Sequence, residues 1–223
     1  MIQNDDREAG FLVRVTDMVA HELRNVLATV KEHTEHVEDL ISITGSDDTR
    51  AKERILESLA AIKEQVIRGS NLAQRINLFS QGHETAESEL DLNELVEMLE
   101  PLAEPFSRKK GIRVNLIHPA RPMVMVGNPL QILMILAGSM DFLAGLAGSR
   151  DTLEIRVSQR PGKGLMVSFT SASLQKGIRS DTWAPVEQHQ WNELEALARS
   201  SSARVGLIAD RGLLVVVFET EWI

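Results

Sequence analysis

The sequence predicts a two-domain protein of α plus α/β type, in which a long antiparallel helical hairpin precedes an α+β sandwich. Three observations predict it. Apolar residues recur every three or four positions over residues 11–80, with one short break of turn-forming residues. A polar linker follows at 81–90, and beyond it short alternating apolar segments are interleaved with helical ones. We therefore assign the hairpin to 1–80 and the α+β domain to 91–223, and a chain of 223 residues is long enough for both.

The first predicted helix covers residues 11–44, a segment without proline or glycine. Its apolar stripe consists of Leu12, Val15, Val19, Leu23, Val26, Val30, Val37 and Ile41. Gly45 to Asp48 supplies turn and N-cap residues, and the second helix runs from about Thr49 to Ser80. One hairpin cannot cover both stripes, so we expect a second copy to complete a dimeric four-helix bundle. The alternative is packing against the C-terminal region of the same chain.

The second domain begins with a predicted helix at about 91–108. Its other elements are strands near Ile112–Leu116 and Val124–Val126, an apolar helix at 129–146, a β-hairpin over 153–169, a helix near 186–201, and strands around 203–208 and 213–219. Alternating helices and strands favour a mixed sheet with helices on one face.

Composition excludes several classes of function. The chain has no cysteine, which excludes disulfides and thiolate chemistry, and it has a net charge of −8 without a basic region that would indicate a nucleic-acid interface. Its N-terminus is polar and acidic, unlike a signal peptide. The apolar stretch from Pro129 to Gly148 contains Gln131, Ser139 and Asp141 and is expected to be a buried helix rather than a membrane span. We expect a cytoplasmic protein with neither membrane nor nucleic acid as a partner.

The segment His21-Glu22-Leu23-Arg24-Asn25 carries the chemistry. His21 is two residues from both Val19 and Leu23, so on a helix it points away from the apolar stripe, and Asn25 and Ala28 share its exposed face. An imidazole with an ordinary pKa of about 6.5 is largely neutral and nucleophilic at cellular pH. A neighbouring carboxylate such as Glu22 can orient the ring proton and stabilise the charge formed on attack. A phosphoryl group is a suitable electrophile.

A zinc site is the main alternative use of a His-Glu pair. The motif H-E-x-x-H requires a second histidine at position 25, which is asparagine here. His33 and His36 have a spacing compatible with a metal, but no third ligand is evident. We therefore predict no metal site and assign the other histidines to solvent-exposed surface.

The segment MVAHELRNVLATV resembles the phosphoacceptor box of bacterial sensor histidine kinases, with Val26 at the position usually occupied by proline. The segment LAQRINLFS is similar to the end of that family's second dimerisation helix. The resemblance implies that His21 is phosphorylated and that Glu22 is its acid/base partner. It also implies that Asn25 occupies a position that assists hydrolysis of the partner's aspartyl phosphate. The Val26 replacement should remove a local bend without affecting the nucleophile.

The second domain resembles the same family's ATP-binding domain in outline only. The positions that would coordinate magnesium and nucleotide hold Ile135 and Ser139, and the loop expected to read Asp-x-Gly-x-Gly is Thr170 to Leu174. The expected glycine-rich lid reads Val186 to Trp191. Loss of the aspartate, the glycines and the oxygen ligand predicts that this domain does not bind ATP and that the chain has no cofactor.

A phosphoacceptor hairpin joined to a degenerate ATPase-like domain resembles the dimeric histidine phosphotransferases of phosphorelays. The resemblance implies that His21 carries a phosphoryl group between the aspartates of response-regulator receiver domains, with magnesium bound by the receiver. Arg24 and Ala28 are candidate docking residues beside His21. Three alternatives stay open: a catalytically silent dimeric adaptor or inhibitor, a divergent histidine kinase, and a receiver phosphatase that uses Asn25.

Overall fold

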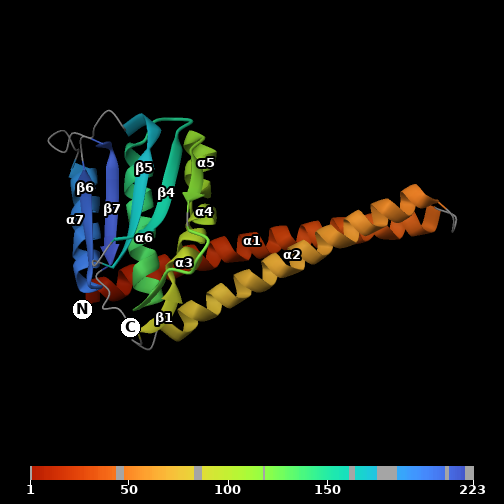
Figure 1. The fold of residues 1–223 in the computed structure, drawn as a ribbon, viewed down its shortest axis with the longest axis horizontal. Helices are drawn as coiled ribbons and strands as arrows, with labels where there is room; N and C mark the ends of the chain where they lie inside the picture. The colour runs from red at the N-terminus through yellow and green to blue at the C-terminus, as the bar shows by residue number, and fades with distance from the viewer. Residues whose placement is uncertain are drawn as a thin grey trace. The chain divides into compact units, whose positions relative to one another are not determined.

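The computed structural model describes residues 2–43, 48–82, 87–117, 119–160, 164–174, 185–208 and 211–218 (Figure 1). The chain divides into two compact units, Met1–Gln81 and Gly82–Ile223. The predicted fold class is confirmed, because a long helical hairpin is followed by a domain that combines helices with a mixed sheet.

The first unit consists of α1 (Ile2–Ile43) and α2 (Thr49–Gly82), which run antiparallel (Figure 1). Asp48 is the N-cap of α2, since its Oδ1 accepts hydrogen bonds from the backbone N–H groups of Arg50 at 2.9 Å and Ala51 at 3.2 Å. The remaining residues of the predicted turn, 45–47, lie outside the described residues, as does residue 44, the last of the first predicted helix.

One face of the hairpin is buried, and it contains Val15, Val19 and Val26 of α1 together with Leu72 of α2. The helices approach closely at Gly69, where an added Cβ would lie 3.3 Å from Cγ1 of Val26. A glycine at this position therefore allows the backbone of α2 to pack against the side chain of α1.

A second apolar face of the hairpin is exposed. Large apolar side chains at heptad-related positions of α1 are 62–65% exposed, and those on α2 are 48–66% exposed. We call these residues the exposed stripe: Val13, Leu27 and Ile41 on α1, and Leu56, Leu59, Val66 and Ile67 on α2. Contiguous apolar surface of this kind usually marks an interaction site.

The second unit contains a five-stranded sheet within its described residues, in the order β2-β4-β5-β7-β6. The β2–β4 pair is parallel and the other pairs are antiparallel. Figure 1 shows α6 and α7 on one face of this sheet. The elements are β2 (Arg113–Ile117), α6 (Pro129–Leu146), β4 (Thr152–Gln159), β5 (Leu165–Ser171), the short 3-10 helix η1 (Ala172–Leu174), α7 (Pro185–Ser200), β6 (Ala203–Ile208) and β7 (Leu213–Phe218).

The central helix α6 forms the core of this unit, and its residues Leu133, Ile135 and Leu136 are completely buried. By length and composition α6 could cross a membrane, but 72% of it is buried inside the domain, as is usual for a core helix. Lys110 caps its C-terminus, where Nζ donates to the backbone carbonyls of Ala144 at 3.0 Å and Gly145 at 2.7 Å.

The structure corrects the prediction of one continuous helix at 91–108. Three short helices occur instead: α3 (Leu92–Glu97), α4 (Leu99–Leu102) and α5 (Glu104–Lys110). The breaks at Met98 and Ala103 lie three and two residues before Pro101 and Pro105. Each proline lacks a backbone N–H and disfavours the helical conformation of the turn before it.

The predicted linker 81–90 is shorter than expected. Its last three residues belong to β1 (Ser88–Asp91), which pairs antiparallel with β3 (Val124–Gly127). The β3 strand was predicted from Val124 and Val126, but those two side chains are exposed and Met125 is the buried one.

Gly212 provides a test of the packing at the end of β5. It has φ = +56°, and a Cβ added there would lie 2.2 Å from the carbonyl oxygen of Leu174. We expect Gly212→Ala to lower the free energy of unfolding by at least about 2 kcal/mol, because both the backbone conformation and the space oppose a side chain. Urea denaturation of the wild type and the variant measures this difference in the free energy of unfolding.

Gly145→Ala is the matched control, since a Cβ there meets no atom within 4 Å. This variant should be unchanged or up to about 1 kcal/mol more stable, because alanine is the better helix former. Equal stability of both variants would contradict the close approach at Gly212.

Candidate functional site

The predicted phosphoacceptor box lies in the middle of α1, which continues without interruption through Val26. His21, Arg24, Asn25 and Ala28 are exposed, on the side of α1 where helical spacing placed them. Glu22 is half-buried, with 17% of its side chain exposed. The small side chain of Ala28 leaves the surface beyond His21 open.

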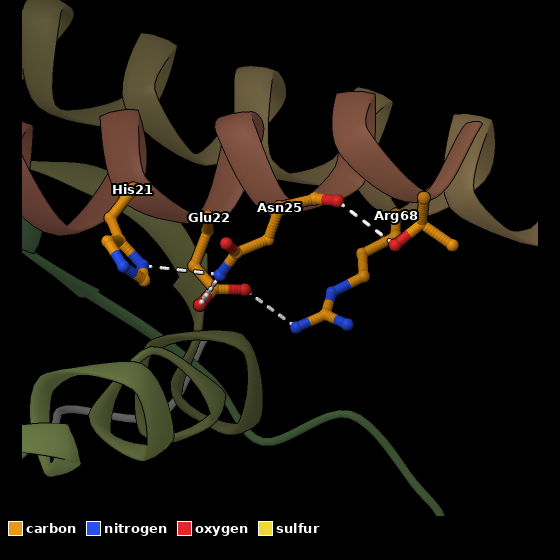
Figure 2. Close-up of polar contacts among 5 residues, drawn as sticks. His21, Glu22, Asn25 and Arg68 are labelled. Carbon is orange, nitrogen blue, oxygen red and sulfur yellow. Dashed lines mark hydrogen bonds and ion pairs between the residues drawn. The ribbon is translucent and has the colours of Figure 1, made fainter. Parts of the chain in front are cut away.

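Three polar side chains of α1 form a connected group, the box network of His21, Glu22 and Asn25 (Figure 2). Nδ2 of Asn25 lies 3.2 Å from Nδ1 of His21 and 3.4 Å from Oε1 of Glu22. The backbone carbonyl of Asn25 accepts a hydrogen bond from Thr29 Oγ1 at 3.1 Å. The amide of Asn25 therefore bridges the imidazole and the carboxylate.

Arg68 of α2 joins this network, and sequence reasoning missed it. Its Nη2 donates to Oε2 of Glu22 at 2.7 Å, an ion pair between residues 46 positions apart (Figure 2). A signal was present in the sequence, since Glu22 precedes and Arg68 follows the hairpin turn by nearly the same number of residues. Because the Arg68 side chain is 58% exposed, solvent screens the pair and it contributes about 0–1 kcal/mol to stability. Its main effect is therefore to hold the Glu22 carboxylate in one position.

Arg24, a candidate docking residue, is folded against its own helix. Its Nε donates to the backbone carbonyl of Ala20 at 3.1 Å, and the side chain stays exposed. The geometry thus groups His21, Glu22 and Asn25 with Arg68 and leaves Arg24 outside the network.

A second polar cluster lies at the end of β5 in the other unit. Oδ2 of buried Asp151 accepts hydrogen bonds from the hydroxyls of Ser171 and Ser173. Oδ1 accepts the backbone N–H of Thr152 at 2.7 Å, and Ser173 Oγ accepts the backbone N–H of Gly148 at 3.0 Å. These bonds fix the conformation of η1 and connect it to the loop after α6.

No family model and no curated protein matches the chain. Solved structures do resemble it. The catalytic domain of the histidine kinase ThkA superimposes with a TM-score of 0.50 at 12% identity, over 60% of this chain and 97% of that one. The ATP-binding domain of PrrB from Mycobacterium tuberculosis gives 0.44 at 13% identity, over 62% and 99%. The histidine kinase AdeS of Acinetobacter baumannii gives 0.48 at 12% identity, over 91% and 98%.

The second unit has the histidine-kinase catalytic-domain fold. The sequence singled out positions that would hold magnesium and nucleotide in such a domain, so the residues present there can be tested against those ligands. Ile135 and Ser139 of α6 are completely buried, and Ser139 Oγ donates back to the carbonyl of Ile135 at 2.7 Å. Neither side chain offers an oxygen ligand to a metal ion at the surface.

The loop and lid positions of this histidine-kinase-like domain also fit a nucleotide poorly. Thr170 to Leu174 form the end of β5 and η1, and their serines bind Asp151. The segment predicted as a replaced lid, Val186 to Trp191, lies in the first turns of α7. The donor set expected for magnesium-bound ATP is therefore missing at each position that the sequence singled out.

Asp151 gives the histidine-kinase-like domain a predictable response to acid. Burial raises the pKa of the Asp151 carboxyl, but hydrogen bonds from Ser171, Ser173 and the backbone N–H groups of Thr152 and Ser173 outweigh this and hold the pKa below its ordinary value of 3.8. Because the folded-state pKa is depressed, the carboxylate stabilises the fold above about pH 4, and that stabilisation is lost as the pH falls through the folded-state value.

We expect Asp151→Asn to lower the free energy of unfolding at pH 7 by about 1.5–3 kcal/mol, since charged hydrogen bonds are lost. The difference from the wild type should shrink below about pH 4, where the unfolded wild-type chain begins to bind the proton. Urea midpoints measured at neutral and acid pH would check this. A difference that is the same at both pH values would contradict the assignment.

Proposed function

We propose that this chain is a histidine phosphotransferase of a two-component phosphorelay, in which His21 carries a phosphoryl group between receiver-domain aspartates. The observation that supports this most directly is the box network, an exposed imidazole in hydrogen-bond contact with Asn25 and next to Glu22. Because the sheet domain lacks the nucleotide ligands described above, the phosphoryl donor in this proposal is another protein.

The reaction is an exchange between two high-energy phosphoryl groups. The imidazole nitrogen of His21 attacks phosphorus, the P–O bond to the receiver's aspartate breaks, and the aspartate leaves as a carboxylate. Both donors are similarly reactive, so catalysis requires mainly in-line positioning. Glu22 stabilises the charge that develops on the ring, and Asn25 orients the imidazole. The receiver supplies magnesium, which neutralises the transferred group.

We propose a homodimer formed through the exposed stripe. The stripe's side chains on both helices are 48–66% exposed, and burying the exposed half of each one favours association by about 0.7–1.5 kcal/mol. Receiver domains dock on the other side of α1, around His21, Arg24 and Ala28. The cytoplasm, where receivers act, is the proposed location.

Transfer from a panel of phosphorylated receivers tests the proposal. Each receiver is charged with radiolabelled acetyl phosphate, freed of it, and mixed with this chain. An acid-labile, base-stable label on the chain is expected with at least one receiver. A parallel reaction with labelled ATP is expected to give no label.

Each other outcome identifies a different function. Labelling by ATP would overturn the proposal in favour of a divergent histidine kinase. Loss of label from the receiver without labelling of the chain would indicate a phosphatase. Binding of a receiver without either reaction would indicate an adaptor.

A further inference from the structure

The box network determines which nitrogen of the His21 ring carries the proton. The carboxylate of Glu22 can only accept hydrogen bonds, so the Asn25 side chain must present its NH₂ group, not its oxygen, at 3.4 Å from Oε1. The same NH₂ group lies 3.2 Å from Nδ1 of His21. Nδ1 is therefore a hydrogen-bond acceptor, and the neutral ring carries its proton on Nε2.

This tautomer is the unreactive one for attack from Nε2. A protonated Nε2 has no lone pair in the ring plane, and the lone pair of Nδ1 is engaged by Asn25. Attack from Nε2 requires the proton to be on Nδ1 instead, which in turn requires an acceptor beside Nδ1. Glu22 is an acceptor on the adjacent residue, but its other oxygen is bound by Arg68 at 2.7 Å.

We propose that Arg68 is a positioning residue that holds His21 in the Nε2–H tautomer. It pairs with Glu22, keeps that carboxylate away from Nδ1, and through it fixes the orientation of the Asn25 amide. Gly69 places Arg68 there, because its missing side chain allows α2 to approach Val26, the residue after Asn25. Release of Glu22 from Arg68 would make the carboxylate available to accept a hydrogen bond from Nδ1–H. Exchange with solvent would then move the ring proton from Nε2 to Nδ1 and leave the Nε2 lone pair free.

The functional consequence rests on the proposed phosphotransferase role. A receiver that contacts α2 near Arg68 and weakens its pair with Glu22 would favour the nucleophilic tautomer of His21 only while that receiver is bound. In the transfer step the new bond joins Nε2 to phosphorus, the P–O bond to the receiver's aspartate breaks, and the proton stays on Nδ1 until solvent removes it.

Nitrogen NMR of ¹⁵N-histidine-labelled full-length protein tests the tautomer directly. Spectra are recorded in weakly alkaline buffer, where imidazoles are neutral, and His21→Ala identifies the His21 signals. Arg68→Gln is expected to raise the ratio of Nδ1–H to Nε2–H about two- to fivefold, the range that corresponds to an exposed ion pair. Arg68→Lys, which can keep the pair, should resemble the wild type.

The controls make the result specific. Arg54→Gln removes the same charge from an exposed position on the same helix and should leave the ratio unchanged. Asn25→Asp replaces the donor beside Nδ1 with an acceptor and should move the proton to Nδ1, which calibrates the signal. An unchanged ratio in Arg68→Gln, or an equal change in Arg54→Gln, would overturn the proposal.

Transfer kinetics provide the second measurement. Arg68→Gln is expected to accept a phosphoryl group about two- to fivefold faster than the wild type in a single turnover. If Arg68→Gln shifts the tautomer ratio but accepts a phosphoryl group more slowly than the wild type, the proposed link between tautomer and transfer rate is overturned. Because the NMR ratio needs no receiver, a failed tautomer prediction can be distinguished from a failed phosphotransferase assignment.

Discussion

Replacing His21 with alanine is expected to abolish phosphoryl transfer from a phosphorylated receiver to this chain. The imidazole is the nucleophile, and neither Glu22 nor Asn25 can form the acid-labile, base-stable linkage of a phosphohistidine. The loss should be complete within the detection limit, because the covalent intermediate cannot form. The measurement is a time course of label on the chain, with binding of the same receiver followed in parallel by calorimetry.

Two other histidines of the same helix provide matched controls. His33 and His36 are half-exposed in α1 and lie three and four turns beyond His21. His33→Ala and His36→Ala should keep the wild-type rate, since neither residue contacts the box network. If label persists in His21→Ala and disappears in His33→Ala or His36→Ala, the phosphorylated residue is the one replaced in that variant and not His21. Receiver binding that is unaffected in His21→Ala would show that docking and chemistry are separate functions of the same surface.

Much of this fold follows from local sequence patterns. The 3.6-residue periodicity of the first 80 residues gave two helices, and the Asp48 cap lies where turn chemistry placed it. Alternation of apolar residues likewise located β4 and β5, and β6 and β7 lie where strands were predicted on either side of a turn. The prediction of one helix over 91–108 was wrong, although Pro101 and Pro105 within this segment are local signals for a break.

The parts that sequence reasoning missed depend on residues far apart in the chain. Arg68 reaches Glu22 because Gly69 lets two helices approach, and single-helix periodicity does not contain that information. Asp151 is surrounded by Ser171 and Ser173 because β4 and β5 are neighbours in the sheet. In both cases a charge is satisfied by a partner from another element, which follows only from knowing which elements are adjacent.

Negative charges in the exposed stripe are expected to change the oligomeric state of the protein. Introducing Leu59→Glu together with Val66→Glu should convert a dimer of about twice 24.8 kDa into a monomer of 24.8 kDa. Both positions are about half-exposed in the single hairpin, so glutamates there cost little in the monomer. In a dimer they would be buried without a partner charge, which costs several kcal/mol per interface. Light scattering gives the mass, and far-UV circular dichroism checks that the helices persist.

Arg54→Glu is the matched control, because it places a negative charge at an exposed position of the same helix, about 120–160° around the axis from each stripe residue of α2. It should stay dimeric. A double glutamate variant that remains a dimer would place the interface on another surface. A wild-type protein that is monomeric in solution would contradict the proposed homodimer and indicate that the exposed stripe binds a different protein.

The position of the exposed stripe relative to His21 connects assembly with transfer. On α1, Leu27 of the stripe is six residues from His21, which separates the two side chains by about 120° around the helix axis. Dimerisation through the stripe therefore leaves the box network accessible on the outside of the bundle. If His21 docks a receiver using residues of its own hairpin alone, the monomeric double glutamate variant should still accept a phosphoryl group. If a receiver needs both hairpins, the same variant should lose transfer although His21 and its hydrogen bonds stay intact. An unchanged NMR tautomer ratio of His21 would verify that the site itself is unaffected in this variant.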